Sequence, residues 1–300
     1  MIGENNNMTT NEAREIVRSF DESNVLSEEE IFMYTEALGF LIDKEKNPRD
    51  MLRLGGWYYD QRQFDLALKY YEMAADFDYD PAYECLGYIW YYGRTGERDF
   101  KKAFEYFSKL MDKGDLVAAY KVADMYRNGY YVDQDYDRYV EIIESLYPRA
   151  KDLRYTNQPL PEIFSRLARI RVKQGREKEA VNLYLRAKDF QAQRLIYSTF
   201  FGDLNIMKWI IEDLYGLIEF DPDDFSLFDL YYLLKEPHKV SFEYEGGEYV
   251  VESVQEEKDC SISFGGKWYL DPDAFFKNAA IDDRKLSTLN QELYLFTLVQ

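Results

Sequence analysis

The stretch AYECLGYIWYYGRTGERDFKKAFEYFSKLMDKGD, residues Ala82–Asp115, decides the fold because its pattern returns 36 residues later. The second copy reads AAYKVADMYRNGYYVDQDYDRYVEIIESLY, residues Ala118–Tyr147. Small, apolar and glycine positions coincide in the two copies: Ala82 with Ala118, Leu86 with Val122, Gly93 with Gly129 and Leu110 with Leu146. A period of this length is typical of stacked helical hairpins, in which each hairpin buries its apolar face on the next.

Shorter copies of the same sequence repeat flank these two. In the long copies, the small residue of the first helix and its counterpart in the second helix have a spacing of 16 positions, as from Gly87 to Ala103. The flanking copies have a spacing of 12, from Gly55 to Ala67 and again in a fourth copy that contains Ala168 and Ala180. Small residues are needed where paired helices approach closely. In the third copy Tyr139 takes the small position, so we expect it to open that helix pair.

The long copies resemble Sel1-like repeats, and the short copies are similar to tetratricopeptide repeats. The resemblance is carried by the turns YYGRTGERDF and RNGYYVDQDY, and by Leu54, Gly55, Tyr58, Ala67, Tyr71 and Ala74 in the first short copy. It implies an α-α superhelix that holds other proteins, with the first helix of each hairpin lining a concave groove. Departures from the pattern are Tyr139 for alanine, and Ala123 and Ala168 for glycine.

The chain on either side of the repeats has different patterns. Thr9-x-x-Glu12 and Ser27-x-x-Glu30 are capping boxes that predict N-terminal helices. Beyond about residue 236 apolar residues alternate, which predicts β-hairpins with turns at Gly246-Gly247 and at Gly265-Gly266. Asp-Pro-Asp runs at 221–223 and 271–273 predict helix starts, and Leu286, Leu289 and Leu293 predict a final helix before a short strand near 296–299.

These patterns together predict a mainly α fold, an α-α superhelix with a small C-terminal α+β module that contains β-hairpins. Residues 1–8 are expected to be a disordered lead-in, and residues 9–47 to form N-terminal capping helices. The repeat array is expected over residues 48–235 and the α+β module over 236–300.

Composition limits the classes of function. The chain has 56 acidic and 37 basic residues, a net charge of −19, which argues against direct nucleic-acid binding because phosphate contacts need Lys and Arg. Two distant cysteines, Cys85 and Cys260, do not make a disulfide scaffold or a zinc motif. The N-terminus does not read as a signal peptide, and no apolar run reaches the roughly 20 residues that span a bilayer. We therefore expect a cytoplasmic protein with no membrane contact.

The residues that could support catalysis are sparse. His238 is the one histidine, and no phosphate-binding loop is present. Asp133, Asp135, Asp137 and Glu144 match four positions of a calcium loop, but Arg138 stands where glycine is required, and Tyr136–Tyr147 is expected to be helical. We expect no catalytic residues, no metal and no cofactor, and thus no enzyme. An enzyme that uses scattered carboxylates, such as a hydrolase, is the alternative.

The expected concave face is unlike the rest of the chain in charge. Its predicted partner-binding residues are Arg53, Tyr59, Tyr88, Tyr91, Tyr92, Tyr120, Lys121, Arg127, Asn128, Arg166, Arg169 and Lys173. Six of these are basic. Among the positions of the first helices that are expected to face the groove, only Asp60, Glu84 and Asp124 are acidic. The groove is therefore expected to bind a protein or peptide, as an extended acidic segment or a terminal carboxylate. Long basic side chains that cover apolar helix surface would give the same pattern.

The favoured function is a protein–protein interaction scaffold or adaptor. An alternative is an acidic inhibitor or decoy that occupies a basic, nucleic-acid-binding surface of its target. The C-terminal module has eleven acidic residues between Glu243 and Asp283, so it is a second candidate surface for a basic partner. It could instead cap the array, or dock as a lid on the basic face of the repeats. The sequence does not predict the oligomeric state.

Overall fold

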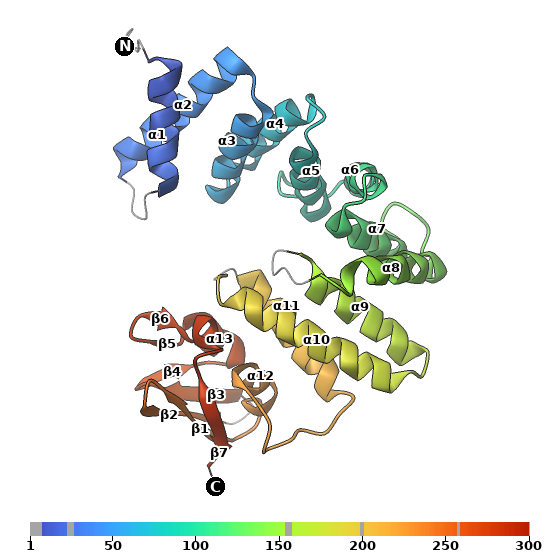
Figure 1. The fold of residues 1–300 in the computed structure, drawn as a ribbon, viewed down its shortest axis with the longest axis vertical. Coiled ribbons are helices and arrows are strands. Elements are labelled where there is room, and N and C mark those ends of the chain that lie inside the picture. Colours follow the sequence, from blue (N-terminus) through green and yellow to red (C-terminus); the bar gives the residue numbers. More distant parts are fainter. Residues whose placement is uncertain (1–7, 23–26, 154–157, 199–200, 257–258, 300) are drawn as a thin grey trace. The chain divides into compact units, whose positions relative to one another are not determined.

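The structure, a computed structural model, describes residues 8–22, 27–153, 158–198, 201–256 and 259–299 (Figure 1). It is mainly helical, with a small antiparallel sheet near the C-terminus, as the sequence predicts. Contacts divide the chain into two compact units, Met1–Tyr139 and Val140–Gln300. The division falls inside one helix, α8 (Tyr136–Ala150). The two units are called unit 1 and unit 2 below, and each is described by itself.

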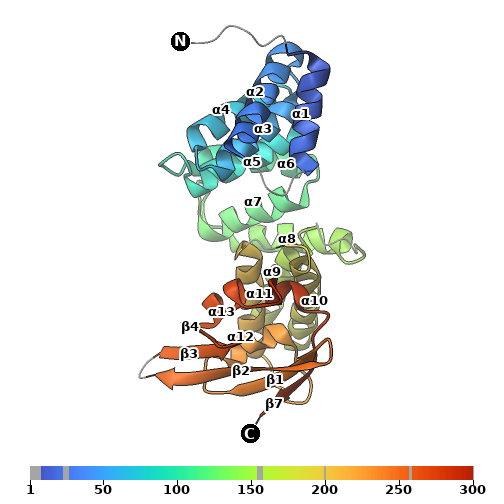
Figure 2. The same cartoon turned by 90° about the vertical axis from the view of Figure 1, so that its left-hand side faces the viewer.

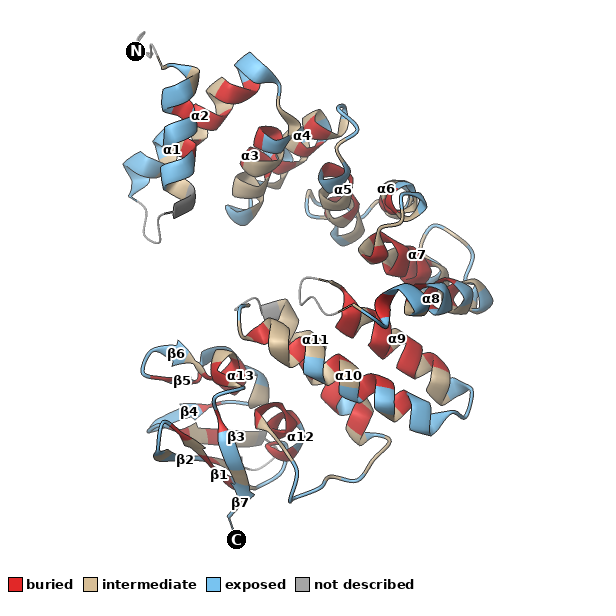
Figure 3. Cartoon of the chain, in the orientation of Figure 1, coloured by how far each residue is buried: buried red, intermediate tan, exposed pale blue. Residues whose placement is uncertain are grey.

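Unit 1 consists of consecutive helices, each packed on the next. They are α1 (Thr10–Glu22), α2 (Glu28–Glu45), α3 (Pro48–Asp60), α4 (Phe64–Ala75), α5 (Asp80–Tyr92), α6 (Phe100–Asp112) and α7 (Leu116–Asn128). The bounds of α5 and α7 differ by 36 residues at both ends, and so do the starts of α6 and α8. The 36-residue period is therefore confirmed. Helix α7 is buried along most of its length (Figure 3).

The ends of these helices follow from a few residues. Gly93 and Gly129 end α5 and α7 with φ of 64° and 68°, a left-handed conformation that glycine adopts without strain. The Asp135 carboxylate accepts a hydrogen bond of 2.8 Å from the Arg138 amide at the start of α8. Asp135 therefore caps a helix, and the part of the calcium-loop pattern from Tyr136 to Glu144 lies on helical backbone. In the described part of the chain, no three His, Cys, Asp or Glu side chains are grouped to hold a metal ion.

Close helix contacts explain the small residues of the first two repeats. A Cβ atom added to Gly87 would lie 2.6 Å from Cε1 of Phe107, and one added to Gly55 would lie 2.6 Å from Cδ1 of Tyr71. In the third repeat Tyr139 is buried, with 1% of its surface exposed. Its ring centre lies 5.5 Å from the Arg127 guanidinium.

The N-terminal helices have a core of their own. Ser27 and Glu30 form the predicted capping box at the start of α2. The ring of Phe20 in α1 stacks on Tyr34 in α2, with 3.6 Å between ring centroids. Met8 is partly buried against this core, although the sequence places it in a disordered lead-in. Residues 1–7 of that lead-in lie outside the described residues.

Unit 2 combines helices with a sheet (Figure 2). Its helices are α9 (Leu160–Lys173), α10 (Glu177–Leu195), α11 (Phe201–Tyr215), the short α12 (Leu230–Leu233) and α13 (Pro272–Asn278), with 3-10 turns at Leu227–Asp229 and Leu286–Leu289. The five-stranded sheet has the order β4-β3-β2-β1-β7, from β1 (Lys239–Tyr244), β2 (Gly247–Glu256), β3 (Asp259–Phe264), β4 (Lys267–Tyr269) and β7 (Tyr294–Leu298). A separate pair joins β5 (Ala280–Ile281) to β6 (Arg284–Lys285).

The two hairpins are present, and one turn differs by a residue from the prediction. Tyr244 pairs with Gly247, so the first turn is Glu245-Gly246, with φ of 49° and 77°, and not Gly246-Gly247. Positive φ at both turn residues suits the right-handed twist of the strands. The predicted second turn, Gly265-Gly266, is confirmed, with φ of 57° and 74°.

One predicted helix start and one predicted helix in this region are wrong, whereas the helix expected through Phe228–Leu234 is largely present as the turn Leu227–Asp229 and α12. The run at 221–223 starts no helix; the helical turn begins at Leu227, where Ser226 and Asp229 form a capping box. Asp229 is fully buried and also binds Lys188 Nζ at 2.6 Å, which fixes the helix start there. Leu286 and Leu289 lie in a 3-10 turn and Leu293 lies beyond it, so no final helix forms. The helix start at Asp271 is confirmed.

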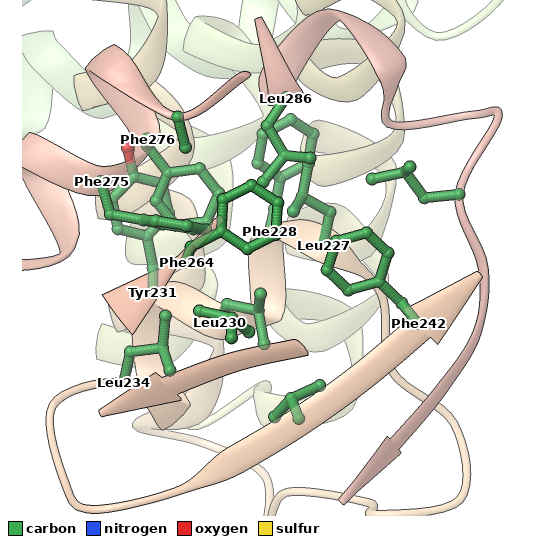
Figure 4. Packing of buried hydrophobic residues seen from close by; sticks show 14 of the residues in the cluster. Leu227, Phe228, Leu230, Tyr231, Leu234, Phe242, Phe264, Phe275, Phe276 and Leu286 are labelled. Atoms are coloured by element: carbon green, nitrogen blue, oxygen red, sulfur yellow. The ribbon is translucent and has the colours of Figure 1, made fainter. Parts of the chain in front are cut away.

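The α+β module shares one hydrophobic core with the last repeat helices. Met207 and Ile211 of α11 belong to the same buried cluster as Phe242 and Phe264 of the sheet. Phe228 and Phe276 of this cluster stack at 5.9 Å between ring centroids (Figure 4). Helices α10 and α11, the sheet and α13 are therefore parts of one folded body.

Candidate partner-binding surface

Four tyrosine rings surround the ammonium group of Lys121 in unit 1. The distances from Lys121 Nζ to the ring centroids are 5.0 Å for Tyr88, 5.2 Å for Tyr91, 5.6 Å for Tyr92 and 5.5 Å for Tyr120. A cation within about 6 Å of an aromatic centroid is attracted by the negative face of the ring. The sequence predicted all five residues for the partner-binding face, and the structure brings them together.

Helix geometry explains this cluster. Tyr88 and Tyr92 are four residues apart on α5, so they lie on one face and their rings stack at 6.0 Å, only 4° from parallel. Tyr120 and Lys121 come from α7, one repeat later. Tyr120 is buried, whereas Tyr92 is 43% exposed. The cluster therefore has a packed base and an accessible rim.

Arg94 extends the cluster toward α3, and the sequence projection missed it. Its guanidinium carbon lies 5.1 Å from the Tyr92 ring centroid and 5.8 Å from that of Tyr59, and its Nε donates a hydrogen bond of 2.9 Å to the Tyr59 hydroxyl. The projection counted positions inside helices, and Arg94 follows the left-handed Gly93. A basic residue directly after a helix-ending glycine was the available signal. We call Tyr59, Tyr88, Tyr91, Tyr92, Arg94, Tyr120 and Lys121 the tyrosine–cation surface.

Burial and neighbouring groups shift two titrations in this region. Burial, and then the neighbouring Tyr120 and Glu84, raise the pKa of Tyr88, so this phenol is neutral at physiological pH. Burial also raises the pKa of the Glu84 carboxyl, the Asp115 carboxylate raises it further, and the positive charge of Lys121 opposes both. Glu84 is thus the carboxyl group whose charge interacts with Lys121 across the surface.

The other residues predicted in unit 1 lie in different surroundings. Arg53 is half-buried on α3, and its charge opposes the burial that raises the pKa of Asp50. Arg127 Nη2 lies 3.9 Å from Oδ1 of the buried Asp124. Asn128 is exposed at the end of α7.

The remaining three predicted residues, Arg166, Arg169 and Lys173, lie on α9 of unit 2. Arg169 Nε donates to Oδ2 of Asp213 at 2.7 Å, and the Tyr184 hydroxyl donates to the same oxygen at 3.1 Å. Arg166 Nη1 donates to the Glu162 carbonyl oxygen on its own helix, and Lys173 is exposed. The Asp213 carboxylate balances the charge of Arg169, so the positive excess on α9 is smaller than the sequence projection suggests.

Comparison with solved structures identifies the architecture. A Sel1 repeat protein from Oxalobacter formigenes superposes with a TM-score of 0.53 and 17% identity, over 75% of this chain and 84% of that one. The chain has a Sel1-like helical-repeat fold. The C-terminal part of a tetratricopeptide repeat-containing protein from Cytophaga hutchinsonii matches at a TM-score of 0.40 and 14% identity, over 70% of this chain and 83% of that one. No family model and no curated protein matches the sequence.

A third solved structure with this fold is c5321, a protective antigen present in uropathogenic Escherichia coli strains. It matches at a TM-score of 0.33 and 15% identity, over 69% of this chain and 56% of that one. In the described part of this chain, no helix combines the length and the apolar character needed to cross a bilayer.

Proposed function

We propose that this chain is a non-catalytic scaffold that binds a protein partner, and that an extended acidic segment of the partner lies on the tyrosine–cation surface. The fold supports the general role, because stacked helical hairpins present extended surfaces that suit protein ligands. The particular surface is supported by the residues that meet on it.

One observation carries the proposal: Lys121 Nζ lies within 5.6 Å of four tyrosine ring centroids. An ammonium held by several rings has lost part of its conformational freedom before a ligand arrives, so pairing with a carboxylate costs less entropy. Tyrosine also offers rigid apolar area with a polar tip, which is why it is common at the centre of protein interfaces.

The overall charge of the chain works against an acidic ligand at long range. The net charge is −19, yet solvent screens interactions beyond about 8 Å at physiological ionic strength. Contacts within the tyrosine–cation surface are shorter than this. The local pairing of Arg94 and Lys121 with carboxylates therefore decides affinity at contact distance.

The test is the fluorescence anisotropy of a dye-labelled, twelve-residue Gly/Ser peptide that contains aspartates, titrated with the full chain. Lys121→Gln is expected to weaken binding about fivefold, since an exposed ion pair contributes up to about 1 kcal/mol. The matched control is Lys102→Gln. Lys102 lies on a different helix, α6, and its Nζ is 3.8 Å from the ring centroid of Trp90.

Equal affinities of the wild type and Lys121→Gln would contradict the proposal. Tighter binding of a lysine peptide than of the aspartate peptide would favour the acidic-inhibitor alternative. That alternative has one supporting feature in unit 2, where Glu243 and Glu248 stand directly opposite each other in β1 and β2. Like charges in this register repel, and a basic ligand would relieve the repulsion.

A further inference from the structure

The ring of Tyr92 lies near two cations, and their distances from it limit the kind of acidic segment that fits. The Arg94 guanidinium carbon lies 5.1 Å from the Tyr92 ring centroid, and Lys121 Nζ lies 5.6 Å from the same point. The two positive groups are therefore at most about 11 Å apart, the sum of these distances. The Tyr92 ring that both groups approach is exposed.

We propose that the tyrosine–cation surface recognises two carboxylates that are two or three residues apart in an extended segment, one paired with Arg94 and the other with Lys121. This inference rests on the proposed function and adds the spacing to it. An extended strand advances about 3.3 Å per residue, so carboxylates at positions i and i+2 are about 7 Å apart on one face. In a polyproline II segment, with three residues per turn, positions i and i+3 share a face at about 9 Å.

Wider spacings do not suit the surface. Carboxylates six residues apart in an extended segment are separated by about 20 Å, which exceeds the reach between Arg94 and Lys121. Such a segment makes one ion pair at a time. The second contact is lost, together with the effective-concentration advantage that follows from binding two linked groups.

Glu84 adds an internal competitor for the ligand. Glu84 is half-buried on α5, one helical turn before Tyr88, whose ring centroid lies 5.0 Å from Lys121 Nζ. The positive charge of Lys121 opposes the burial that raises the pKa of the Glu84 carboxyl. An incoming carboxylate therefore shares Lys121 with Glu84. Removal of the Glu84 charge is expected to leave the ammonium in place and to increase its attraction for the ligand.

The test compares three labelled peptides of identical composition, Gly/Ser dodecamers with blocked ends and two aspartates at i,i+2, at i,i+3 or at i,i+6. Anisotropy with the full chain is expected to show about fivefold tighter binding of the two closely spaced peptides, the contribution of one additional exposed ion pair. Arg94→Gln and Lys121→Gln are each expected to remove the preference. Glu84→Gln is expected to tighten binding of the i,i+2 peptide, an effect that damage to the fold would not produce.

The outcomes separate the two proposals. If all three peptides bind equally tightly, and Lys121→Gln weakens each of them, the spacing rule is wrong and the acidic-segment proposal stands. If none of the three binds, both proposals fail. If the i,i+6 peptide binds most tightly, the contacts lie elsewhere and the spacing rule is also overturned. Far-UV circular dichroism of each variant verifies that the helices are retained.

Discussion

Individual side chains in this protein combine apolar packing with a polar contact. The tyrosines show this most clearly, since the rings of Tyr88 and Tyr120 pack in the base of a cluster with their centroids 5.0 Å and 5.5 Å from Lys121 Nζ. Asp229 shows the same principle with a charge. It is fully buried, and it accepts hydrogen bonds from Lys188 Nζ, the Tyr215 hydroxyl and Ser226. A buried carboxylate is tolerated only with such complete pairing.

Asp229→Asn is expected to destabilise unit 2 by about 3–5 kcal/mol, because it leaves the Lys188 ammonium without its anionic partner. The Lys188 side chain is only 18% exposed, so water replaces that partner poorly. Urea denaturation followed by circular dichroism measures this loss. The matched control is Asp223→Asn, an exposed position that is expected to change stability by less than about 0.5 kcal/mol. A loss for Asp229→Asn as small as that of the control would show that the buried ion pair contributes little.

At the scale of the helices, repetition in the sequence predicts the structure well. The 36-residue alignment predicts the matching bounds of α5 and α7, since both helices end at a glycine that has positive φ. The same alignment projects Tyr88, Tyr91 and Tyr92 onto one face of their helix, because of helical periodicity, and in the structure their rings lie near Lys121. Local patterns therefore suffice wherever neighbouring repeats supply the packing.

Long-range contacts explain where the sequence predictions fail. The Asp-Pro-Asp run at 221–223 has the local features of a helix start, but the helix begins at Leu227. There Asp229 is held by Lys188, 41 residues earlier in the chain, which no local pattern reveals. Arg94 was missed for a related reason: it belongs to a turn, and its contact with Tyr59 spans 35 residues. The final helix predicted from Leu286 is replaced by a 3-10 turn that packs in the shared core.

Gly87→Ala tests the close approach of α5 and α6. Its Cβ would lie 2.6 Å from Phe107 Cε1, so the helices must separate, at a cost of about 1–3 kcal/mol. Gly39→Ala, inside α2 with no atom within 4 Å of the added Cβ, is the matched control and should gain up to about 1 kcal/mol from helix propensity. Thermal unfolding of both variants measures the difference. Equal stabilisation by both substitutions would mean that Phe107 moves aside without cost.

At the scale of the whole chain, each unit has its own packing. In unit 1 the helices pack in order along the chain, with the tyrosine–cation surface formed by residues of α3, α5 and α7 and by Arg94 after α5. In unit 2 the α+β module and the last repeat helices form one core. We propose to assign the partner contact to unit 1, because the tyrosine–cation surface lies there.

The most direct measurement of this assignment is photo-crosslinking with the i,i+2 aspartate peptide, with benzoylphenylalanine as the residue between the aspartates. Mass spectrometry of the digested complex locates the attached residues. The account predicts crosslinks to Tyr92 and its neighbours on α5 and α7, which an excess of unlabelled peptide suppresses and Lys121→Gln reduces. Specific crosslinks confined to residues 140–300, or to α4 and α6 of unit 1, would contradict it.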